Sequence, residues 1–215
     1  MNLIEVHMRL LKYFGKQGWW PAETPFEVVV GAVLVQRTTW RNVEWALANL
    51  KTAGLLNPKA LSMADIRLVE ELVKPAGFYR QKAQRIVIFS KYLVAKYEGS
   101  LDKLLRGSLE GVRQELLSME GIGPETADSI LLYAAHKPVF PIDLYVKRIL
   151  KRLGLIPSLN LAYEDVQSLV QEGLPASVEV YKELRALMVR LGKTYCRKKP
   201  LCLKCPLTDI CAHSL

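Results

Sequence analysis

A glycine turn between two apolar stretches restricts the fold of this chain more than any other feature. Gly121 and Gly123 flank Ile122, and Pro124 follows directly. The two glycines permit a sharp turn, while the isoleucine fills the gap between the elements on either side. Proline is favoured at the first position of a helix, where its missing N–H has no partner to lose. The pattern predicts a helix ending at Met119, a tight hairpin and a second helix.

The same turn has a chemical property, because backbone N–H groups at a helix N-terminus point outward and can bind phosphate. After the second helix, a proline-containing connection leads to Asp143, which opens a predicted helix over 143–153. Aspartate is a favoured N-cap, so capping this helix is an alternative to a chemical role for the Asp143 carboxylate. Hairpins of this kind are common in helical proteins, and the turn alone leaves the function open.

Apolar periodicity predicts helices along the rest of the chain, about ten in all. A valine run at 25–36 fits a buried strand or a buried helix, but no second convincing strand exists to pair with it. Gly18 is predicted to end the first helix, and Thr38 or Thr39 to cap the third. The chain therefore reads as all-α. Besides the hairpin helix that begins at Pro124, the predicted helices cover 2–17, 25–36, 40–53, a short stretch from Asn57-Pro58, 64–74, 80–97, 108–119, 143–153, 163–173 and 178–193.

Composition narrows the class of partner. The 215 residues suggest one or two domains with a substantial core, and half of them are hydrophobic. Lys and Arg total 30 against 21 Asp and Glu, which gives a net charge of +9 and favours a polyanionic partner. No signal segment and no apolar run of about 18 residues is present. We therefore expect a soluble, intracellular protein with no membrane partner.

All four cysteines lie in the last twenty residues, as Cys196-x5-Cys202-x2-Cys205-x5-Cys211. Two disulfides are disfavoured in an intracellular protein. Four thiolates indicate zinc or an iron–sulfur cluster. Zinc ribbons usually pair two short Cys-x2-Cys units, and only one such unit is present. A cubane cluster can take its ligands at wider separations along a wrapping loop.

The segment GIGPETADSILLYA followed by PIDLYVKRIL resembles the helix-hairpin-helix and trailing aspartate of the helix-hairpin-helix (HhH-GPD) base-excision DNA glycosylases. The resemblance implies that Asp143 is the essential carboxylate and that Gly121, Ile122 and Gly123 contact DNA. A carboxylate suits this chemistry because breaking an N-glycosidic bond builds positive charge on the sugar. Family members that also cleave the strand carry a lysine at the position of Glu125 here, and a carboxylate cannot form their Schiff base.

One branch is matched over most of the chain up to Leu153: the monofunctional 3-methyladenine DNA glycosylase III type. The matching segments are WWP (19–21), FEVVVGAVLVQRTTW (26–40), KPAGFYRQKAQRI (74–86) and GIGPETADSILLYA (121–134). By position, the resemblance assigns the base pocket to Trp19, Trp20, Trp40 and Lys193, with Trp40 replacing a Phe. An indole face suits a cationic alkylated purine. Gln36 matches the residue that fills the gap left in the duplex by the flipped base.

The cysteine tail departs from that branch and resembles the [4Fe–4S] loop of the endonuclease III group, whose first interval is usually six residues rather than five. This resemblance implies that all four cysteines are ligands of a [4Fe–4S] cluster. Arg197, Lys198 and Lys199 lie between the first two ligands. A loop anchored by the cluster would hold these cations against a phosphate backbone.

We therefore expect two helical lobes with a DNA-binding cleft. A six-helix barrel domain would span 22–135, and 1–21 with 136–215 would form the iron–sulfur cluster domain. The expected activity is hydrolytic excision of alkylated purines, above all 3-methyladenine and further 7-methylguanine, from damaged double-stranded DNA, without Schiff-base lyase activity. The expected protein is a monomer in the cytoplasm of a prokaryote, associated with the nucleoid. The alternatives are an endonuclease III-like glycosylase for mismatched or oxidised pyrimidines and a cluster-bearing DNA-binding module without turnover.

Overall fold

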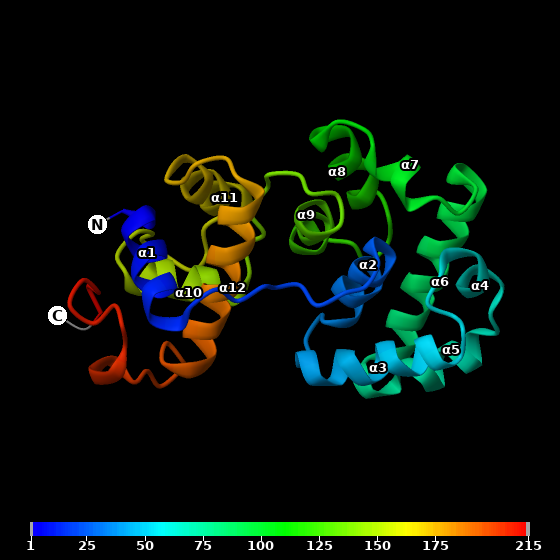
Figure 1. Ribbon diagram of the computed structural model, residues 1–215, viewed down its shortest axis with the longest axis horizontal. Coiled ribbons are helices and arrows are strands. Elements are labelled where there is room, and N and C mark those ends of the chain that lie inside the picture. Colours follow the sequence, from blue (N-terminus) through cyan, green and yellow to red (C-terminus); the bar gives the residue numbers. More distant parts are fainter. Residues whose placement is uncertain (1, 214–215) are drawn as a thin grey trace. The chain divides into compact units, whose positions relative to one another are not determined.

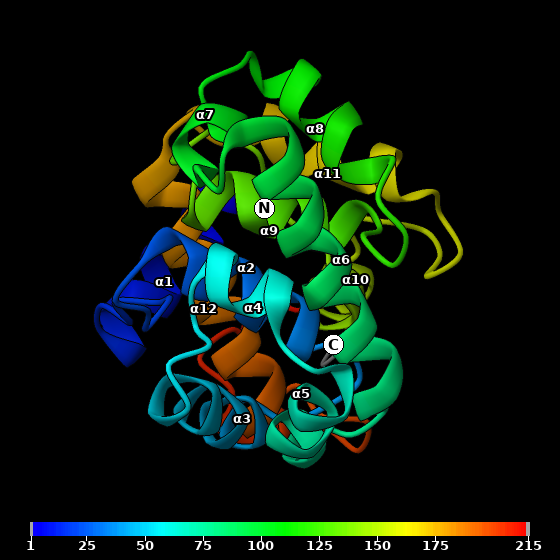
Figure 2. The same cartoon turned by 90° about the vertical axis from the view of Figure 1, so that its right-hand side faces the viewer.

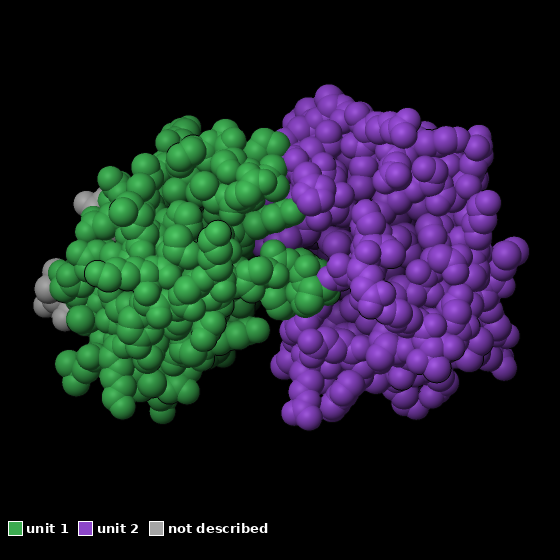
Figure 3. All heavy atoms as spheres, in the orientation of Figure 1, with its two compact units in different colours: residues 1–21, 138–215 green, residues 22–137 purple. Residues whose placement is uncertain are grey.

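A computed structural model describes residues 2–213 of the chain. Every regular element in this part of the chain is a helix, which confirms the all-α prediction, and none of them is long and apolar enough to cross a membrane. The chain forms two compact units: residues 22–137 make one, and residues 1–21 and 138–215 together make the other (Figure 3).

Helices pack in the unit of residues 22–137 around a long helix, α6, and an apolar one, α2. Its elements are α2 (Pro25–Leu34), α3 (Trp40–Thr52), α4 (Pro58–Met63), α5 (Ile66–Val73), the 3₁₀ turn η1 (Lys74–Ala76), α6 (Tyr79–Tyr97), α7 (Leu101–Leu105), α8 (Leu109–Leu117) and α9 (Pro124–Tyr133). Helices α4, α5 and α7 contact α6, and α2 contacts α3, α6 and α9 (Figures 1 and 2). The valine run lies in α2, where residues 28–34 are all buried. A helix that is apolar on every side belongs in a core.

Three helices of this unit begin with a proline at the first position. Asn57 caps α4 by accepting a hydrogen bond from the N–H of Ala60 at 2.9 Å, and Thr24 caps α2 in the same way through Glu27. Gly123 stands at the N-cap of α9 with extended backbone. The starts of α2 and α4 follow from sequence alone, because capping side chains satisfy N–H groups that no preceding turn can reach.

In the second unit, helices pack on α12. Its elements are α1 (Leu3–Phe14), α10 (Leu144–Arg152), α11 (Tyr163–Glu172), α12 (Val178–Thr194) and the 3₁₀ turn η2 (Cys202–Lys204). Both α1 and α10 contact α12 (Figure 1). Tyr181, Leu184 and Met188 of α12 are each at most 1 % exposed. Their spacing places them on one face of the helix, and that face forms the core of this unit.

Several predicted helix ends lie too far along the chain, and α2, for example, ends at Leu34 rather than at residue 36. The first helix ends at Phe14 rather than at Gly18, because Gly15 adopts a φ of 70° and its N–H donates to the carbonyl oxygen of Leu11. A left-handed φ costs glycine little, so the nearer glycine ends the helix. The first hairpin helix likewise ends at Leu117, before the predicted Met119.

A helix that the sequence did not predict lies between two glycines. Ser100 caps α7, with its hydroxyl accepting a hydrogen bond from the N–H of Lys103 at 3.3 Å. Leu101, Leu104 and Leu105 are buried. A helix of five residues is too short to show periodicity, and it forms because its leucines pack against α6.

The two helices of the hairpin are joined by a buried ion pair. Arg113 of α8 donates from Nε to Asp128 Oδ1 at 2.7 Å and from Nη2 to Oδ2 at 3.3 Å. The Asp128 side chain is fully buried, and the Arg113 side chain is 12 % exposed. A bidentate pair of this kind fixes both the separation and the rotation of α8 against α9.

A lysine is buried beside the turn that precedes α6. Lys82 is 1 % exposed, and its Nζ donates to the carbonyl oxygen of Ala76 at 2.8 Å. Burial lowers the pKa of Lys82 to about 8, and the positive charge of Arg85 contributes to the shift. The amine therefore holds the backbone of η1 at the cost of a desolvated charge.

This burial predicts how stability depends on pH. Because the folded-state pKa of about 8 lies below the ordinary value of 10.5, the unfolded chain binds more protons between these values. The free energy of unfolding should therefore gain a rising contribution from Lys82 between pH 8 and pH 10. Urea unfolding at several pH values should show this rise in the wild type and in the exposed control Lys91→Met, but not in Lys82→Met. An equal rise in Lys82→Met would contradict the assignment.

Candidate functional site

The hairpin turn has the geometry that its sequence predicts. Gly121 has a φ of 80°, a region that favours glycine, and the N–H of Ile122 bonds to the carbonyl of Met119 at 3.1 Å. Ile122 is 6 % exposed and fills the space between α8 and α9. Gly123 precedes α9, so the first N–H groups of that helix lie at the turn.

The turn is braced by two side chains from other helices. Gln36, just beyond α2, donates from Nε2 to the carbonyl of Gly121 and to Oγ1 of Thr126, both at 3.0 Å. Arg85 of α6 donates from Nη1 to Gln36 Oε1 at 2.8 Å. A Cβ on Gly121 would lie 2.0 Å from Arg85 Nε, so any larger residue would displace this guanidinium in addition to straining the backbone. The amide of Gln36 is thus directed to the hairpin, and its DNA contact stays a prediction.

Asp143 caps α10 and faces a buried cation. Its Oδ1 accepts a hydrogen bond from the N–H of Val146 at 2.8 Å, which confirms the predicted N-cap. Its Oδ2 lies 3.4 Å from Nη2 of Arg185, a residue of α12. The two side chains are 10 % and 9 % exposed. One carboxylate oxygen therefore belongs to the helix N-terminus and the other to a guanidinium.

The segment that leads to Asp143 is held by side chains of α11. Gln171 Oε1 accepts from the N–H of Phe140 at 2.9 Å, and Gln167 Nε2 donates to the carbonyl of the same residue at 2.8 Å. The hydroxyl of Tyr163 accepts from the N–H of Ile142 at 3.1 Å. The backbone immediately before the carboxylate is therefore fixed by three side-chain contacts rather than by regular structure.

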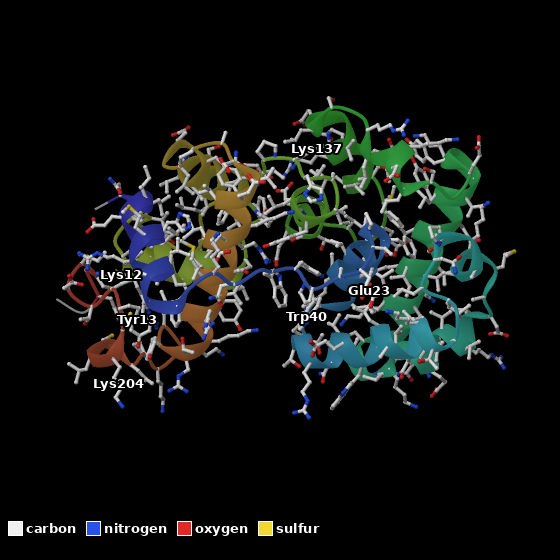
Figure 4. All side chains as sticks on the ribbon, viewed as in Figure 1. Lys12, Tyr13, Glu23, Trp40, Lys137 and Lys204 are labelled. Atoms are coloured by element: carbon white, nitrogen blue, oxygen red, sulfur yellow. The ribbon has the colours of Figure 1, made fainter. Side chains whose placement is uncertain are left out.

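The predicted pocket residues are distributed over both units. Trp19 and Trp20 are consecutive, and their ring centroids lie 5.7 Å apart with the planes at 53°. Trp40 is the first residue of α3 in the unit of residues 22–137 (Figure 4). Lys193 is exposed in the last turn of α12. The structure thus brings the first two tryptophans into contact, and it places Lys193 at a solvent-exposed position.

The cysteine loop is held at both ends by α10, the helix that Asp143 caps. Arg152 donates from Nη1 to Cys196 Sγ at 3.2 Å and to the carbonyl of Arg197 at 2.7 Å. Its own carbonyl accepts from Cys211 Sγ at 3.3 Å. Arg148, one turn earlier, donates from Nε to the carbonyl of Cys196 at 2.8 Å. Two arginines of one helix therefore set where the loop begins and ends.

The donors of this loop suit a soft metal centre. All four cysteines are reduced thiols outside any disulfide and are partly exposed. The pKa of the Cys205 thiol is raised by burial and further by the other three cysteines, so the four sulfurs are close enough to interact electrostatically. No three His, Cys, Asp or Glu side chains within residues 2–213 stand in a metal-binding arrangement. Thiolates are ligands for zinc and for iron–sulfur clusters, so the residue types fit such a group.

The cysteine loop itself carries exposed basic side chains. Arg197, Lys198 and Lys199 are exposed, while the carbonyls of the first two accept hydrogen bonds from Arg152. Lys204, the last residue of η2, is exposed as well (Figure 4). The backbone of this basic loop is anchored while its charged ends remain in solvent, which lowers the entropic cost of binding a polyanion.

Sequence reasoning missed Arg85, Arg148, Arg152 and Arg185. The sequence did contain a signal for Arg148 and Arg152, because two arginines four residues apart lie on one face of the helix that follows Asp143. Arg185 falls on the apolar face of α12, where an isolated charge calls for a partner. The sequence contains no such signal for Arg85, since its contact with Gln36 depends on how α6 packs beside the hairpin.

Comparison with known proteins places this chain among DNA repair enzymes. Residues 30–176 match the model of the HhH-GPD superfamily base excision DNA repair proteins. A Methanocaldococcus jannaschii protein with a provisional DNA repair glycosylase name is 43 % identical over 97 % of this chain and 95 % of its own. Endonuclease III of Thermotoga maritima is 34 % identical over 87 % of this chain and 82 % of its own.

A solved structure agrees with these relatives. The H. pylori 3-methyladenine DNA glycosylase MagIII, bound to 1,N6-ethenoadenine, has a TM-score of 0.79 with 27 % sequence identity, over 90 % of this chain and 98 % of that one. The family match and the glycosylase relatives identify an enzyme rather than a binding module without turnover. This chain belongs to the HhH-GPD superfamily and is a base-excision DNA glycosylase.

Proposed function

We propose that this glycosylase hydrolyses the N-glycosidic bond of alkylated purines in double-stranded DNA, above all 3-methyladenine and further 7-methylguanine. A purine alkylated at these positions is cationic and already a good leaving group. The enzyme then needs little acid catalysis at the base. Its main task is to stabilise the positive charge that develops on the sugar.

The observation that carries the proposal is the pairing of a fixed carboxylate with an unreactive hairpin position. Asp143 is held through both oxygens, which preorganises its negative charge for an oxocarbenium-like transition state. Glu125 stands in the first turn of α9, where strand-cleaving relatives carry a lysine. A carboxylate cannot attack the sugar as an amine does, so excision should leave an intact abasic site.

Aromatic residues support the choice of base. In this proposal Trp20 and Trp40, together with Trp19 and Lys193, contribute to the wall that receives the flipped purine. Indole faces attract a cationic ring more strongly than a neutral one. The likeness to the H. pylori enzyme, whose structure holds a modified adenine, favours the same assignment.

DNA would be bound by groups outside that wall. The proposal assigns phosphate contacts to the N–H groups of the hairpin and to Arg197, Lys198 and Lys199 of the cysteine loop. Gln36 would enter the gap in the duplex, and to do so its amide must leave Gly121 and Thr126. The enzyme would act as a monomer on the nucleoid of a prokaryotic cell.

Endonuclease III-like excision of pyrimidines is the second candidate. The 34 % identity to the Thermotoga maritima enzyme favours it, as does the four-cysteine tail. A neutral pyrimidine, however, is a poor leaving group and needs protonation or covalent catalysis. The lysine for the second route is absent from position 125.

The test compares base release across substrates. Duplexes carrying 3-methyladenine, 7-methylguanine, uracil, a G·T mismatch or thymine glycol are incubated with enzyme and developed with and without alkali. The proposal predicts release of the methylated purines, breaks only after alkali, and no adduct trapped by borohydride. Faster cleavage of any pyrimidine duplex than depurination of methylated DNA would replace the proposal with the second candidate.

We further propose that the four cysteines bind a [4Fe–4S] cluster, and that the unit containing them is a cluster domain. Anaerobically purified protein should then be brown and contain about four irons per chain. Arg152→Met should lower the iron content, because it removes the N–H donor to Cys196 and the clamp on the loop. Iron analysis and absorption spectra measure the cluster content of the wild type and of Arg152→Met, and Arg190→Met is the control. A colourless protein with one zinc per chain would contradict the assignment.

A further inference from the structure

A buried guanidinium on the apolar face of α12 has no task in the activity described so far. Arg185 is 8 % exposed and lies between Leu184 and Met188, both fully buried. A charged side chain at such a site destabilises the fold strongly unless an opposite charge compensates it. A leucine or methionine would fill this position at lower cost, so retention of the charge calls for an explanation.

The partner of Arg185 is the carboxylate on which the proposed chemistry depends. Its Nη2 lies 3.4 Å from Oδ2 of Asp143, while the N–H of Val146 takes Oδ1 at 2.8 Å. Charge-assisted hydrogen bonds between such groups are typically about 2.7–2.9 Å long. The longer contact attracts Oδ2 without saturating it, so this oxygen keeps the capacity to interact with a substrate.

The surroundings of the pair constrain it from several sides. Gln167 and Gln171 hold the backbone at Phe140, and α10 begins directly after the carboxylate. Oδ1 of Asp143 accepts the hydrogen bond of the helix cap, and α12 brings Arg185 close to the other oxygen, Oδ2. With the backbone fixed and one oxygen capped, the guanidinium settles the remaining rotation of the carboxylate.

We propose that Arg185 is the positioning residue for Asp143. It holds Oδ2 in one orientation, so that Asp143 acts as a fixed electrostatic stabiliser of the cation forming on the sugar. The proposal rests on the assignment of Asp143 to catalysis. Arg185 acts through Asp143 and touches neither the base nor the sugar in this role.

The test is a double-mutant cycle on single-turnover excision from methylated duplex DNA. Arg185→Met should slow excision about 10- to 100-fold, the size of effect expected from a small misplacement of a catalytic group. DNA affinity, measured separately, should stay within about twofold, because Asp143 stabilises a charge that develops on the sugar only in the transition state. Arg185→Lys, which retains the charge, should recover part of the rate.

The decisive comparison is made in the Asp143→Asn background. If Arg185 works through the carboxylate, adding Arg185→Met there should change the residual rate by less than about twofold. An equal loss in both backgrounds would overturn the proposal, and so would a wild-type rate in a folded Arg185→Met protein. Arg190→Met, on the same helix but exposed and bonded to Gln17, should leave the single-turnover rate unchanged.

A stability cycle separates this proposal from the proposed substrate. Each single variant removes one member of the buried Arg185–Asp143 pair, so the melting temperature should fall in Arg185→Met and in Asp143→Asn and be partly recovered in the double variant. Additive losses in melting temperature would overturn the pairing whatever base is excised. If the wild type releases a pyrimidine instead of methylated purines, the substrate proposal fails, and the rate cycle is carried out on that pyrimidine.

Discussion

Asp143→Asn should lower the rate of base excision by about 100-fold or more while leaving binding of lesion DNA intact. The substitution removes a negative charge from the place where the sugar becomes positive. Asparagine is as good an N-cap as aspartate, so its side-chain oxygen can still accept from the N–H of Val146. The loss should therefore come from charge rather than from a disrupted α10.

Single-turnover excision and gel-shift titration with a lesion duplex measure the two effects separately. Asp65→Asn is a matched control, because Asp65 caps α5 with its Oδ1 accepting from the N–H of Arg67 at 2.7 Å. That variant should excise at the wild-type rate. If Asp143→Asn also retains near-full activity, Asp143 is only a helix cap and the proposed mechanism is wrong.

The second large effect concerns the stability of the hairpin. Asp128→Asn should lower the free energy of unfolding by about 3–5 kcal/mol, because it removes the negative charge from a buried, hydrogen-bonded ion pair. Since this pair joins α8 to α9, the loss should also loosen the turn at Gly121. Urea unfolding followed by circular dichroism gives the free energy, and amide exchange at the hairpin reports the local loosening.

An exposed ion pair supplies the control for that measurement. Glu71 lies 3.1 Å from Lys74, with side chains that are 65 % and 57 % exposed. Glu71→Gln should change the free energy of unfolding by at most about 1 kcal/mol, since water screens the pair. Comparable losses in Asp128→Asn and Glu71→Gln would mean that the buried pair contributes little to holding the hairpin.

Local sequence determined the elements and the turn on which this fold depends. Helical periodicity was sufficient for the all-α class, and glycine and proline placed the hairpin at residues 121–124. The cap at Asp143 was also predictable, because capping involves only residues three apart. Signals of this kind are read within one or two turns, where the physics of backbone hydrogen bonding is local. Helix ends near competing glycines, as at Gly15, were less predictable.

Only the tertiary structure decided which side chains support these elements. Arg185 reaches Asp143 from another helix, Gln36 reaches the hairpin across 85 residues, and Arg152 reaches Cys196 across 44. Long polar side chains pair wherever packing brings opposite charges or unpaired carbonyls within reach, and that packing depends on the whole unit. Sequence therefore revealed the reactive groups, while the residues that hold them in place became visible only once the helices were packed.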